Sequence, residues 1–292
     1  MKRLDLPSGQ AILAPGVFDA LSGLIAARAG ARALYLSGAA LAYTQLGRPD
    51  LGFLDLTRVV DAAQRITDRV ETPLIVDADT GFGNALNVQR AVRAIENAGA
   101  AAIQLEDQAM PKRCGHLAGK ALVPPAEMCG KIAAALDARR NTEFLIIART
   151  DAVSVEGVDA AFDRAEAFIE VGADVLFIEA LRSEEELALA GKRFAHRIPL
   201  VANMVEGGRT PILSVDQLAA IGYRLVIAPG ALARASAFMA QEFFATLLRD
   251  GSSSNYMQRM LTFDEINGLL GLEELLVLGR SYDLSLVRDA AE

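Results

Sequence analysis

The chain has 292 residues, of which 52% are hydrophobic, so it is long enough to bury the core of one large domain or two small ones. A net charge of −8 and scattered basic residues argue against nucleic acid as a partner. We expect no membrane span, because no apolar run reaches about 18 residues, and no signal peptide. Two cysteines make no disulfide framework and favour the cytoplasm.

Short apolar runs recur along the chain and predict eight β-strands. They are nearly continuous in apolar character, which is typical of parallel strands that are covered on both faces. The predicted strands are 11–16, 33–38, 73–79, 101–107, 144–150, 174–180, 199–204 and 224–230.

Helical patterns separate these runs. The expected helices are 20–31, 55–70, 87–100, 126–140, 158–173 and 183–195. Three of them end at a glycine, Gly30, Gly99 or Gly172, which is the residue expected to cap a helix before the next strand. The repeated strand–helix alternation predicts an α/β fold, a (β/α)8 barrel of the TIM type. A doubly wound open sheet is the alternative, but no G-x-G-x-x-G follows the first strand.

The last part of the chain, 241–292, differs from the rest. It carries helix signals and an apolar stretch at 266–279, which favour a helical extension that packs on a neighbour. We expect 1–292 to form a single domain with 241–292 as its C-terminal extension.

Polar side chains end nearly every predicted strand. In a barrel of this kind the C-terminal ends of the strands form the active-site rim. Loops of any barrel are polar, but these charges lie inside or directly after apolar runs, where burial is costly without a partner. The pattern therefore favours a functional rim. Its members include Tyr35, Ser37, Gly38, Asp77, Asp79, Glu106, Arg149, Glu179, Asn203 and Arg234.

Asp77 and Asp79 are two residues apart on a predicted strand, so their carboxylates should point the same way. Like charges this close repel unless a cation joins them, and oxygen ligands suit Mg²⁺ or Mn²⁺. Glu106 and Glu179 at neighbouring strand ends favour this metal site. The alternative is that the two aspartates only cap the turn-rich stretch DADTGFGN.

Residues 108–120 show no apolar periodicity, and this pattern predicts a mobile loop over the rim. Cys114 stands there beside Lys112, Arg113 and His116, and cationic neighbours lower the pKa of a thiol into a range useful for acid–base chemistry. The alternatives are a zinc ligand, for which the spacing is wrong, and an incidental surface cysteine.

The other cysteine and the other histidine are expected to have no catalytic part. Cys129 lies in a helical pattern beside Met128 and Ile132 and reads as inert. His196 precedes a predicted strand, at the end of the barrel away from the rim, and reads as structural.

The motifs YLSG, GRPDLG, VDADTGFGN, LEDQ, PKRCGH, IARTDA and NMVEGGRTP occur in order between about residues 11 and 240. In them the chain resembles the isocitrate lyase/phosphoenolpyruvate mutase superfamily. Within it, the chain is most similar to 2-methylisocitrate lyases, alkylmalate (2,3-dimethylmalate) lyases and carboxyphosphonoenolpyruvate phosphonomutase-like proteins. The KRCGH motif argues against the mutases that form phosphonates.

The resemblance implies a barrel whose C-terminal helix is exchanged between subunits, in a dimer or a dimer of dimers, of which we expect the homotetramer. It implies Mg²⁺, with Mn²⁺ possible, at Asp77, Asp79 and Glu106. The substrate-binding residues that it implies are Ser37, Gly38, Ala39, Asp50, Gly115, Arg149, Glu179, Asn203 and Arg234.

The chemistry that the resemblance implies is retro-aldol cleavage of a 2-hydroxy di- or tricarboxylate, 2-methylisocitrate or an alkylmalate, to a 2-oxo acid such as pyruvate and a carboxylic acid. Tyr35 would act as the base. Cys114 would protonate the departing carbanion, with Lys112 and His116 setting its pKa. Oxaloacetate decarboxylation or hydrolysis, phosphonomutase activity and a catalytically dead binding module are the alternatives.

Two arginines bear on substrate choice. Arg234 matches a position that binds an extra substrate carboxylate in methylisocitrate lyases. A second arginine is expected in the C-terminal segment, where Arg259 is near but the register places Met260.

Overall fold

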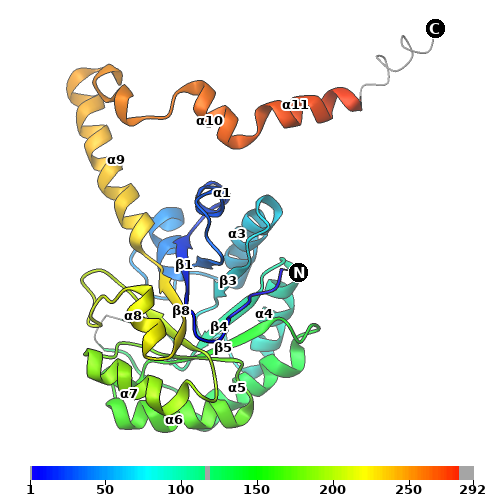
Figure 1. Cartoon of the computed structure of the whole chain (residues 1–292), viewed down its shortest axis with the longest axis vertical. Coiled ribbons are helices and arrows are strands. Elements are labelled where there is room, and N and C mark those ends of the chain that lie inside the picture. The colour runs from blue at the N-terminus through cyan, green and yellow to red at the C-terminus, as the bar shows by residue number, and fades with distance from the viewer. Residues whose placement is uncertain (1, 116–118, 283–292) are drawn as a thin grey trace. The chain divides into compact units, whose positions relative to one another are not determined.

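Eight parallel strands close into a barrel in the computed structural model, which describes residues 2–115 and 119–282 (Figure 1). Each strand pairs with the next along the chain, and the last pairs with the first in the register Ile12↔Leu225. The strands are β1 Ile12–Val17, β2 Leu34–Leu36, β3 Leu74–Asp77, β4 Ala102–Glu106, β5 Leu145–Thr150, β6 Val175–Ile178, β7 Leu200–Asn203 and β8 Tyr223–Ala228. The predicted (β/α)8 barrel is confirmed, and the doubly wound alternative is wrong.

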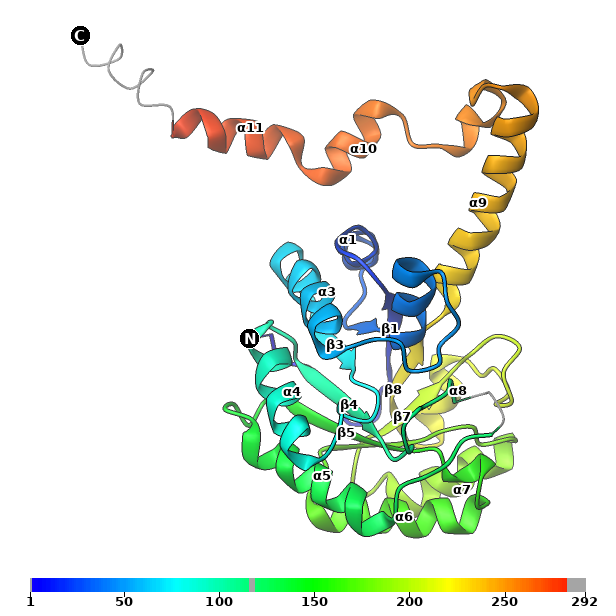
Figure 2. The same ribbon diagram turned by 180° about the vertical axis from the view of Figure 1, so that it is seen from behind.

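Helices surround the barrel, as the view from behind in Figure 2 also shows. They are α1 Ala20–Arg28, α2 Gly38–Leu41, α3 Leu56–Arg69, α4 Ala85–Asn97, α5 Pro125–Ala138, α6 Val158–Val171, α7 Glu184–Phe194 and α8 Val215–Ala220, and β8 is followed by α9 Ala231–Asp250. Two short helical segments, η1 Ala42–Leu46 and η2 Ala152–Ser154, follow α2 and β5. All six expected helices are confirmed, whereas α2, η1 and α8 were not anticipated.

Local sequence explains where these helices begin and end. Asp55 and Ser183 accept hydrogen bonds from backbone N–H groups in the first turns of α3 and α7. Gly30, Gly99 and Gly172 follow helices with φ of 91°, 84° and 105°, a left-handed conformation that favours glycine. The predicted glycine caps are thus confirmed.

The barrel interior is filled by aliphatic side chains and a few aromatic ones. Ala14, Ile75, Ile147 and Leu225 are at most 1% exposed, and Phe177 joins the same buried cluster. Burial of apolar area at this density supplies the main driving force for folding. It also fixes the strand ends, from which the polar side chains of the rim project.

The chain divides into two compact units, residues 1–234 and 235–292. The second contains most of α9, together with η3 Ser254–Arg259, α10 Phe263–Leu270 and α11 Leu272–Ser281. Within it, the rings of Phe243 and Tyr256 pack edge to face at 5.3 Å. The single-domain assignment, the extension at 241–292 and the exchange of a helix between subunits stay predictions. No helix among the described residues is long and apolar enough to cross a membrane.

Two helix glycines give a matched test of the packing. A methyl group at Gly191 in α7 would lie 1.8 Å from the carbonyl oxygen of Ile221, whereas one at Gly130 in α5 would meet nothing within 4 Å. Gly191→Ala should lower the free energy of unfolding in urea by about 1–3 kcal/mol, because the backbone must move. Gly130→Ala should raise it by up to about 1 kcal/mol. Equal effects of the two substitutions would contradict this packing.

Candidate active site

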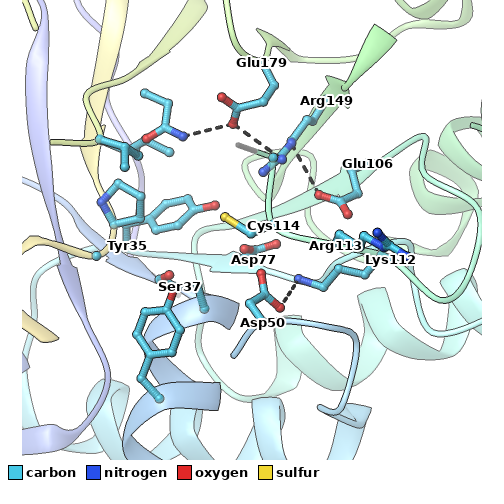
Figure 3. Close-up of a pocket in the computed structure, with 18 of the residues that line it drawn as sticks. Tyr35, Ser37, Asp50, Asp77, Glu106, Lys112, Arg113, Cys114, Arg149 and Glu179 are labelled. Carbon is cyan, nitrogen blue, oxygen red and sulfur yellow. Dashed lines mark hydrogen bonds and ion pairs between the residues drawn. The ribbon is translucent and has the colours of Figure 1, made fainter. Parts of the chain in front are cut away.

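A pocket opens at the C-terminal ends of the strands, where the rim was predicted (Figure 3). Most of the predicted site residues line it. The lining residues are Tyr35, Ser37, Ala39, Tyr43, Asp50, Asp77, Glu106, Lys112, Arg113, Cys114, Gly115, Arg149, Glu179, Asn203, Val205, Ile227, Pro229, Gly230 and Arg234. Of the remaining predicted residues, Gly38 and Asp79 lie against Asp77, and His116 lies outside the described residues.

Asp77 and Asp79 converge, although not for the reason expected from the sequence. Asp77 is the last residue of β3, and Asp79 has a left-handed φ of 48°, so strand alternation does not orient the pair. Both carboxylates instead face Gly38 at the start of α2. A methyl group there would lie 3.1 Å from Asp79 Oδ1 and 3.4 Å from Asp77 Oδ2. Gly38 therefore lets the backbone approach both acids.

The ammonium group of Lys112 lies between two buried carboxylates, 2.6 Å from Asp50 Oδ1 and 2.7 Å from Asp79 Oδ1. Burial would lower the pKa of Lys112, but Asp79, Glu106 and Asp50 raise it well above its ordinary value. Burial raises the pKa of Asp79 to about 7 even though Lys112 opposes the shift. Burial thus disfavours the charge of Asp79 more than the ammonium of Lys112 stabilises it.

The donor set fits a hard divalent cation. Asp77 Oδ1 accepts only neutral donors in the described part of the chain, the N–H of Asp79 at 3.2 Å and the amide of Gln104 at 3.4 Å. Buried Glu106 Oε1 has no hydrogen-bond partner there. No three His, Cys, Asp or Glu side chains among the described residues are arranged to hold a metal by themselves. Asp77, Asp79 and Glu106 nevertheless supply the oxygen donors that suit a hard ion such as Mg²⁺.

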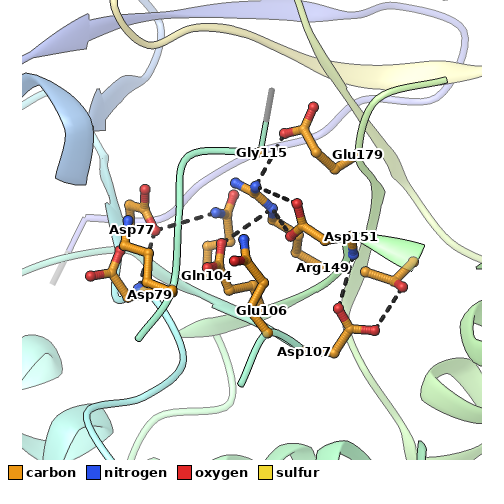
Figure 4. A network of polar contacts seen from close by, with 12 residues as sticks. Asp77, Asp79, Gln104, Glu106, Asp107, Gly115, Arg149, Asp151 and Glu179 are labelled. Atoms are coloured by element: carbon orange, nitrogen blue, oxygen red, sulfur yellow. Dashed lines mark hydrogen bonds and ion pairs between the residues drawn. The ribbon is translucent and has the colours of Figure 1, made fainter. Parts of the chain in front are cut away.

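Arg149, at the end of β5, has its guanidinium held from several sides (Figure 4). Its Nε and Nη2 donate to Asp151 at 2.9 and 3.0 Å, while Glu106 and Glu179 lie 3.3 and 3.5 Å away. The ring of Phe177 packs beneath at 5.1 Å. Burial would lower the pKa of Arg149, but these acids raise it well above its ordinary value. A fully charged guanidinium therefore stays fixed in the rim.

Tyr35 and Gln104 form a buried pair inside the barrel. The Tyr35 hydroxyl donates to Gln104 Oε1 at 3.0 Å, and Gln104 Nε2 reaches Asp77. Burial, followed by the charge of Asp77, raises the pKa of Tyr35 well above its ordinary value. Sequence reasoning missed Gln104, although a lone amide inside the apolar run AAIQLED was the available signal.

Cys114 projects its sulfur into the pocket between Tyr35, Asp77 and Arg149 (Figure 3). Its backbone N–H donates to the carbonyl of Asp50 at 3.3 Å. At the next residue, Gly115, a methyl group would lie 2.5 Å from Arg149 Nη2. Only glycine lets the chain pass this close to the guanidinium.

The outer part of the pocket is more open. Arg234 Nη1 donates to the carbonyl of Glu206 at 2.7 Å and lies 3.3 Å from its carboxylate, and the Arg234 side chain is half exposed. Asn203 donates to Glu179 at 2.9 Å. Tyr43, on the π-helical segment η1, also lines the pocket and was not predicted.

Three further residues lie apart from the pocket lining. Arg259, in the second unit, pairs with Glu242 at 2.8 Å. Cys129 lies on α5, where burial raises the pKa of its thiol. His196 is exposed just before β7, at the opposite end of the barrel from the rim, as expected.

Comparisons with known proteins agree on one family. The model of the phosphoenolpyruvate phosphomutase family matches residues 1–248. A 2,3-dimethylmalate lyase of Eubacterium barkeri is 44% identical, with 95% of each chain covered. A 2-methylisocitrate lyase of Aeropyrum pernix is 47% identical over 90% of this chain and 84% of its own.

Solved structures agree with these relatives. A crystal structure of 2,3-dimethylmalate lyase superposes with a TM-score of 0.89 at 35% identity, covering 94% of this chain and 91% of that one. A phosphonopyruvate hydrolase complex with oxalate and Mg²⁺ superposes with a TM-score of 0.85 at 32% identity, covering 95% and 96%.

Lys112→Met tests the charge balance of the site. Removing the ammonium leaves Asp50 and Asp79 buried without it, so the free energy of unfolding without divalent ions should fall by about 3–5 kcal/mol. Mg²⁺ should restore part of this loss and stabilise the variant more than the wild type, as urea titrations with and without MgCl₂ would measure.

The matched control is Lys192→Met, which removes an exposed lysine of α7 and should change stability by less than about 0.5 kcal/mol. A Lys112→Met variant as stable as this control, or no extra effect of Mg²⁺, would contradict the charge balance.

Proposed function

This chain belongs to the phosphoenolpyruvate mutase/isocitrate lyase superfamily, and from that premise we propose that it is a carbon–carbon lyase dependent on a divalent metal ion. Its substrate would be a 2-hydroxy di- or tricarboxylate, and its products a 2-oxo acid such as pyruvate and a carboxylic acid. Lyases of 2,3-dimethylmalate and 2-methylisocitrate among its relatives support this class. We also assign the enzyme to the cytoplasm, as its two cysteines suggest.

The observation that carries the proposal is the position of Cys114. Its thiol lines the same pocket as the Asp77 carboxylate and the Arg149 guanidinium, so an acid is at hand where negative charge would develop. A general acid at this position distinguishes cleavage that leaves a carbanion from reactions that need only an electron sink.

The metal ion would be held by Asp77 and Asp79 and, through water, by Glu106, with Mg²⁺ preferred to Mn²⁺. When bound, the ion would supply positive charge to the substrate oxygens at C1 and C2. Arg149 would bind the same end of the substrate, since its guanidinium is fixed in place before binding. Ser37, Gly38 and Ala39 would place backbone N–H groups around the substrate carboxylate.

The proton steps would use two groups of the pocket lining, Tyr35 and Cys114. Tyr35 would act as its phenolate, its own proton having passed to solvent, and Oη would take the proton of the C2 hydroxyl. Arg149 favours this ionised form against the burial and nearby carboxylates that raise the pKa of Tyr35. The C2–C3 bond then breaks and its electron pair stays on C3. The Cys114 thiol would deliver its proton to C3, and solvent would later reprotonate the thiolate. Lys112 and His116 are proposed to tune this thiol.

The outer pocket would select the rest of the substrate. Arg234, which lies near Glu206, would bind one extra carboxylate of the substrate. Glu179 and Asn203 would line the middle of the site. Asp50 would keep Lys112 in position. Because the position of the second expected arginine carries Met260, an alkylmalate fits this charge inventory at least as well as 2-methylisocitrate.

Cys114→Ser tests the proposal and separates it from oxaloacetate decarboxylation. A serine hydroxyl is a far weaker acid, so pyruvate formation from the alkylmalate or methylisocitrate that the wild type cleaves should fall by about 10²–10⁴-fold. Any oxaloacetate decarboxylation should persist, because it needs only the metal and an electron sink.

Cys129→Ser is the matched control, because it removes the cysteine of α5 outside the pocket. Assays coupled to lactate dehydrogenase would measure pyruvate formation by the wild type, Cys114→Ser and Cys129→Ser. If Cys114→Ser cleaved every substrate of the wild type at an unchanged rate, the result would contradict the proposal.

An exposed apolar groove on the barrel unit supports the expected homotetramer with exchanged C-terminal helices. A groove between β1, α1 and the start of α9 exposes Leu13, Ile25 and Leu232 by 44%, 46% and 40%. Helix α11 of the second unit exposes Leu275 and Leu276. Exposed apolar patches of this kind mark association sites, and we propose that a second copy's C-terminal helices cover the groove.

Ile25→Asp places a charge in this groove and should reduce the mass in solution from a tetramer towards the 31.1 kDa of one chain. Size-exclusion chromatography with light scattering would measure it. Leu86→Asp, at a 75% exposed position of α4, is the control and should leave the assembly intact. A monomeric wild type, or a tetrameric Ile25→Asp variant, would contradict the proposed assembly.

A further inference from the structure

Lys120 is a buried lysine to which neither the pocket nor the proposed chemistry gives a part. Its side chain is only 1% exposed. Its ammonium donates to the backbone carbonyl of Gly115 and to Asp151 Oδ1, the latter at 2.9 Å. One cation thus joins the main chain beside Cys114 to a carboxylate at the end of β5.

Asp151 also binds the guanidinium of Arg149. Both of its carboxylate oxygens accept from the guanidinium, at 2.9 and 3.0 Å, and its own N–H donates to Asp107 at 2.9 Å (Figure 4). Burial would raise the pKa of Asp151, but Arg149 and Lys120 hold it at about 2. Asp151 is therefore a fixed anion shared by the two cations.

The contact between Gly115 and the rim leaves little room for movement. A methyl group on Gly115 would lie 2.5 Å from Arg149 Nη2 and 2.8 Å from Glu179 Cγ. The backbone that carries Cys114 is thus seated directly on the group expected to bind substrate. Misplacement of a reacting group by about 1 Å can cost about 10²-fold in rate, so this placement needs a rigid support.

We propose that Lys120 is a positioning residue of the active site. By binding the Gly115 carbonyl and the Asp151 carboxylate together, its ammonium fixes the Cys114 thiol relative to the Arg149 guanidinium. The kinetic consequence rests on the proposed function, whereas the placement of Cys114 does not. The competing explanation is a buried ion pair that stabilises the fold and nothing else.

Alkylation of Cys114 by iodoacetamide tests the placement without any substrate. In a Cys129→Ser background, Lys120→Met should raise the alkylation rate of Cys114 by about tenfold, because the segment at Gly115 loses its anchor. Lys120→Gln keeps an amide donor for the Gly115 carbonyl but loses the charge at Asp151, and should give a smaller increase. It also serves if Lys120→Met fails to fold.

Two controls separate positioning from stability. Arg139→Met removes an ion pair with Asp174 at the other end of the barrel, and Lys192→Met removes an exposed charge. Both should alkylate within about twofold of the parent protein, even where Arg139→Met lowers the melting temperature by as much as the Lys120 variants do.

Steady-state kinetics supply the second readout on a substrate that the wild type cleaves. Lys120→Met should lower kcat by about 10²-fold, with a smaller change in KM, because the acid is displaced while most binding groups stay in place. If the wild type cleaves no 2-hydroxy di- or tricarboxylate, the proposed function fails, but the alkylation result still decides the role of Lys120. Alkylation in both Lys120 variants indistinguishable from that in Arg139→Met would overturn it.

Discussion

The site depends on an excess of negative charge buried at the rim of the barrel. Carboxylates outnumber cationic side chains among the buried residues that the structure describes there. The acids are Asp50, Asp77, Asp79, Glu106, Asp107, Asp151 and Glu179, and the cations are Lys112, Lys120, Lys131, Arg149 and Arg164. Burial raises the pKa of Asp79 to about 7 and that of Asp107 to about 6, the cost of keeping such groups ionised away from water. A divalent cation would relieve this cost, which ties fold stability to the proposed chemistry.

The same constraint explains why the cations are fixed by several partners each. Lys112 is shared by Asp50 and Asp79, and Arg149 by Asp151 and its neighbours. A guanidinium held this way needs no reorganisation when charge develops on a substrate, and preorganisation of this kind is a large part of catalysis. Charges nearer to solvent need fewer partners, and the Arg234 side chain is half exposed. Residues that select the substrate can therefore vary there without disturbing the buried charges.

The sequence predicted the barrel because its signals are local and repeated. Apolar runs gave all eight strands, and Gly30, Gly99 and Gly172 ended helices as expected. The rim followed from the rule that parallel strands present their C-terminal ends together. Which side chains meet was harder, because that depends on turns and not on periodicity. Asp79 shows this: its left-handed backbone, not strand alternation, sets its direction.

The missed residues are those whose roles arise from contacts distant in sequence. Gln104 joins Tyr35 to Asp77, and Lys120 joins Gly115 to Asp151. No local pattern marks a lysine in a loop as buried. Tyr43 enters the pocket from a π-helical segment, which periodicity does not indicate.

The most direct test of the account is proton NMR of the purified protein with Mg²⁺ in D₂O. The substrates would be 2-methylisocitrate, isocitrate, 2,3-dimethylmalate, citramalate and oxaloacetate. The account predicts pyruvate or another 2-oxo acid from a 2-hydroxy di- or tricarboxylate, together with a carboxylic acid that carries one deuterium at the carbon released from C2. Turnover of oxaloacetate alone, or of nothing in the panel, would contradict the assignment as a lyase of 2-hydroxy di- or tricarboxylates and the part given to Cys114.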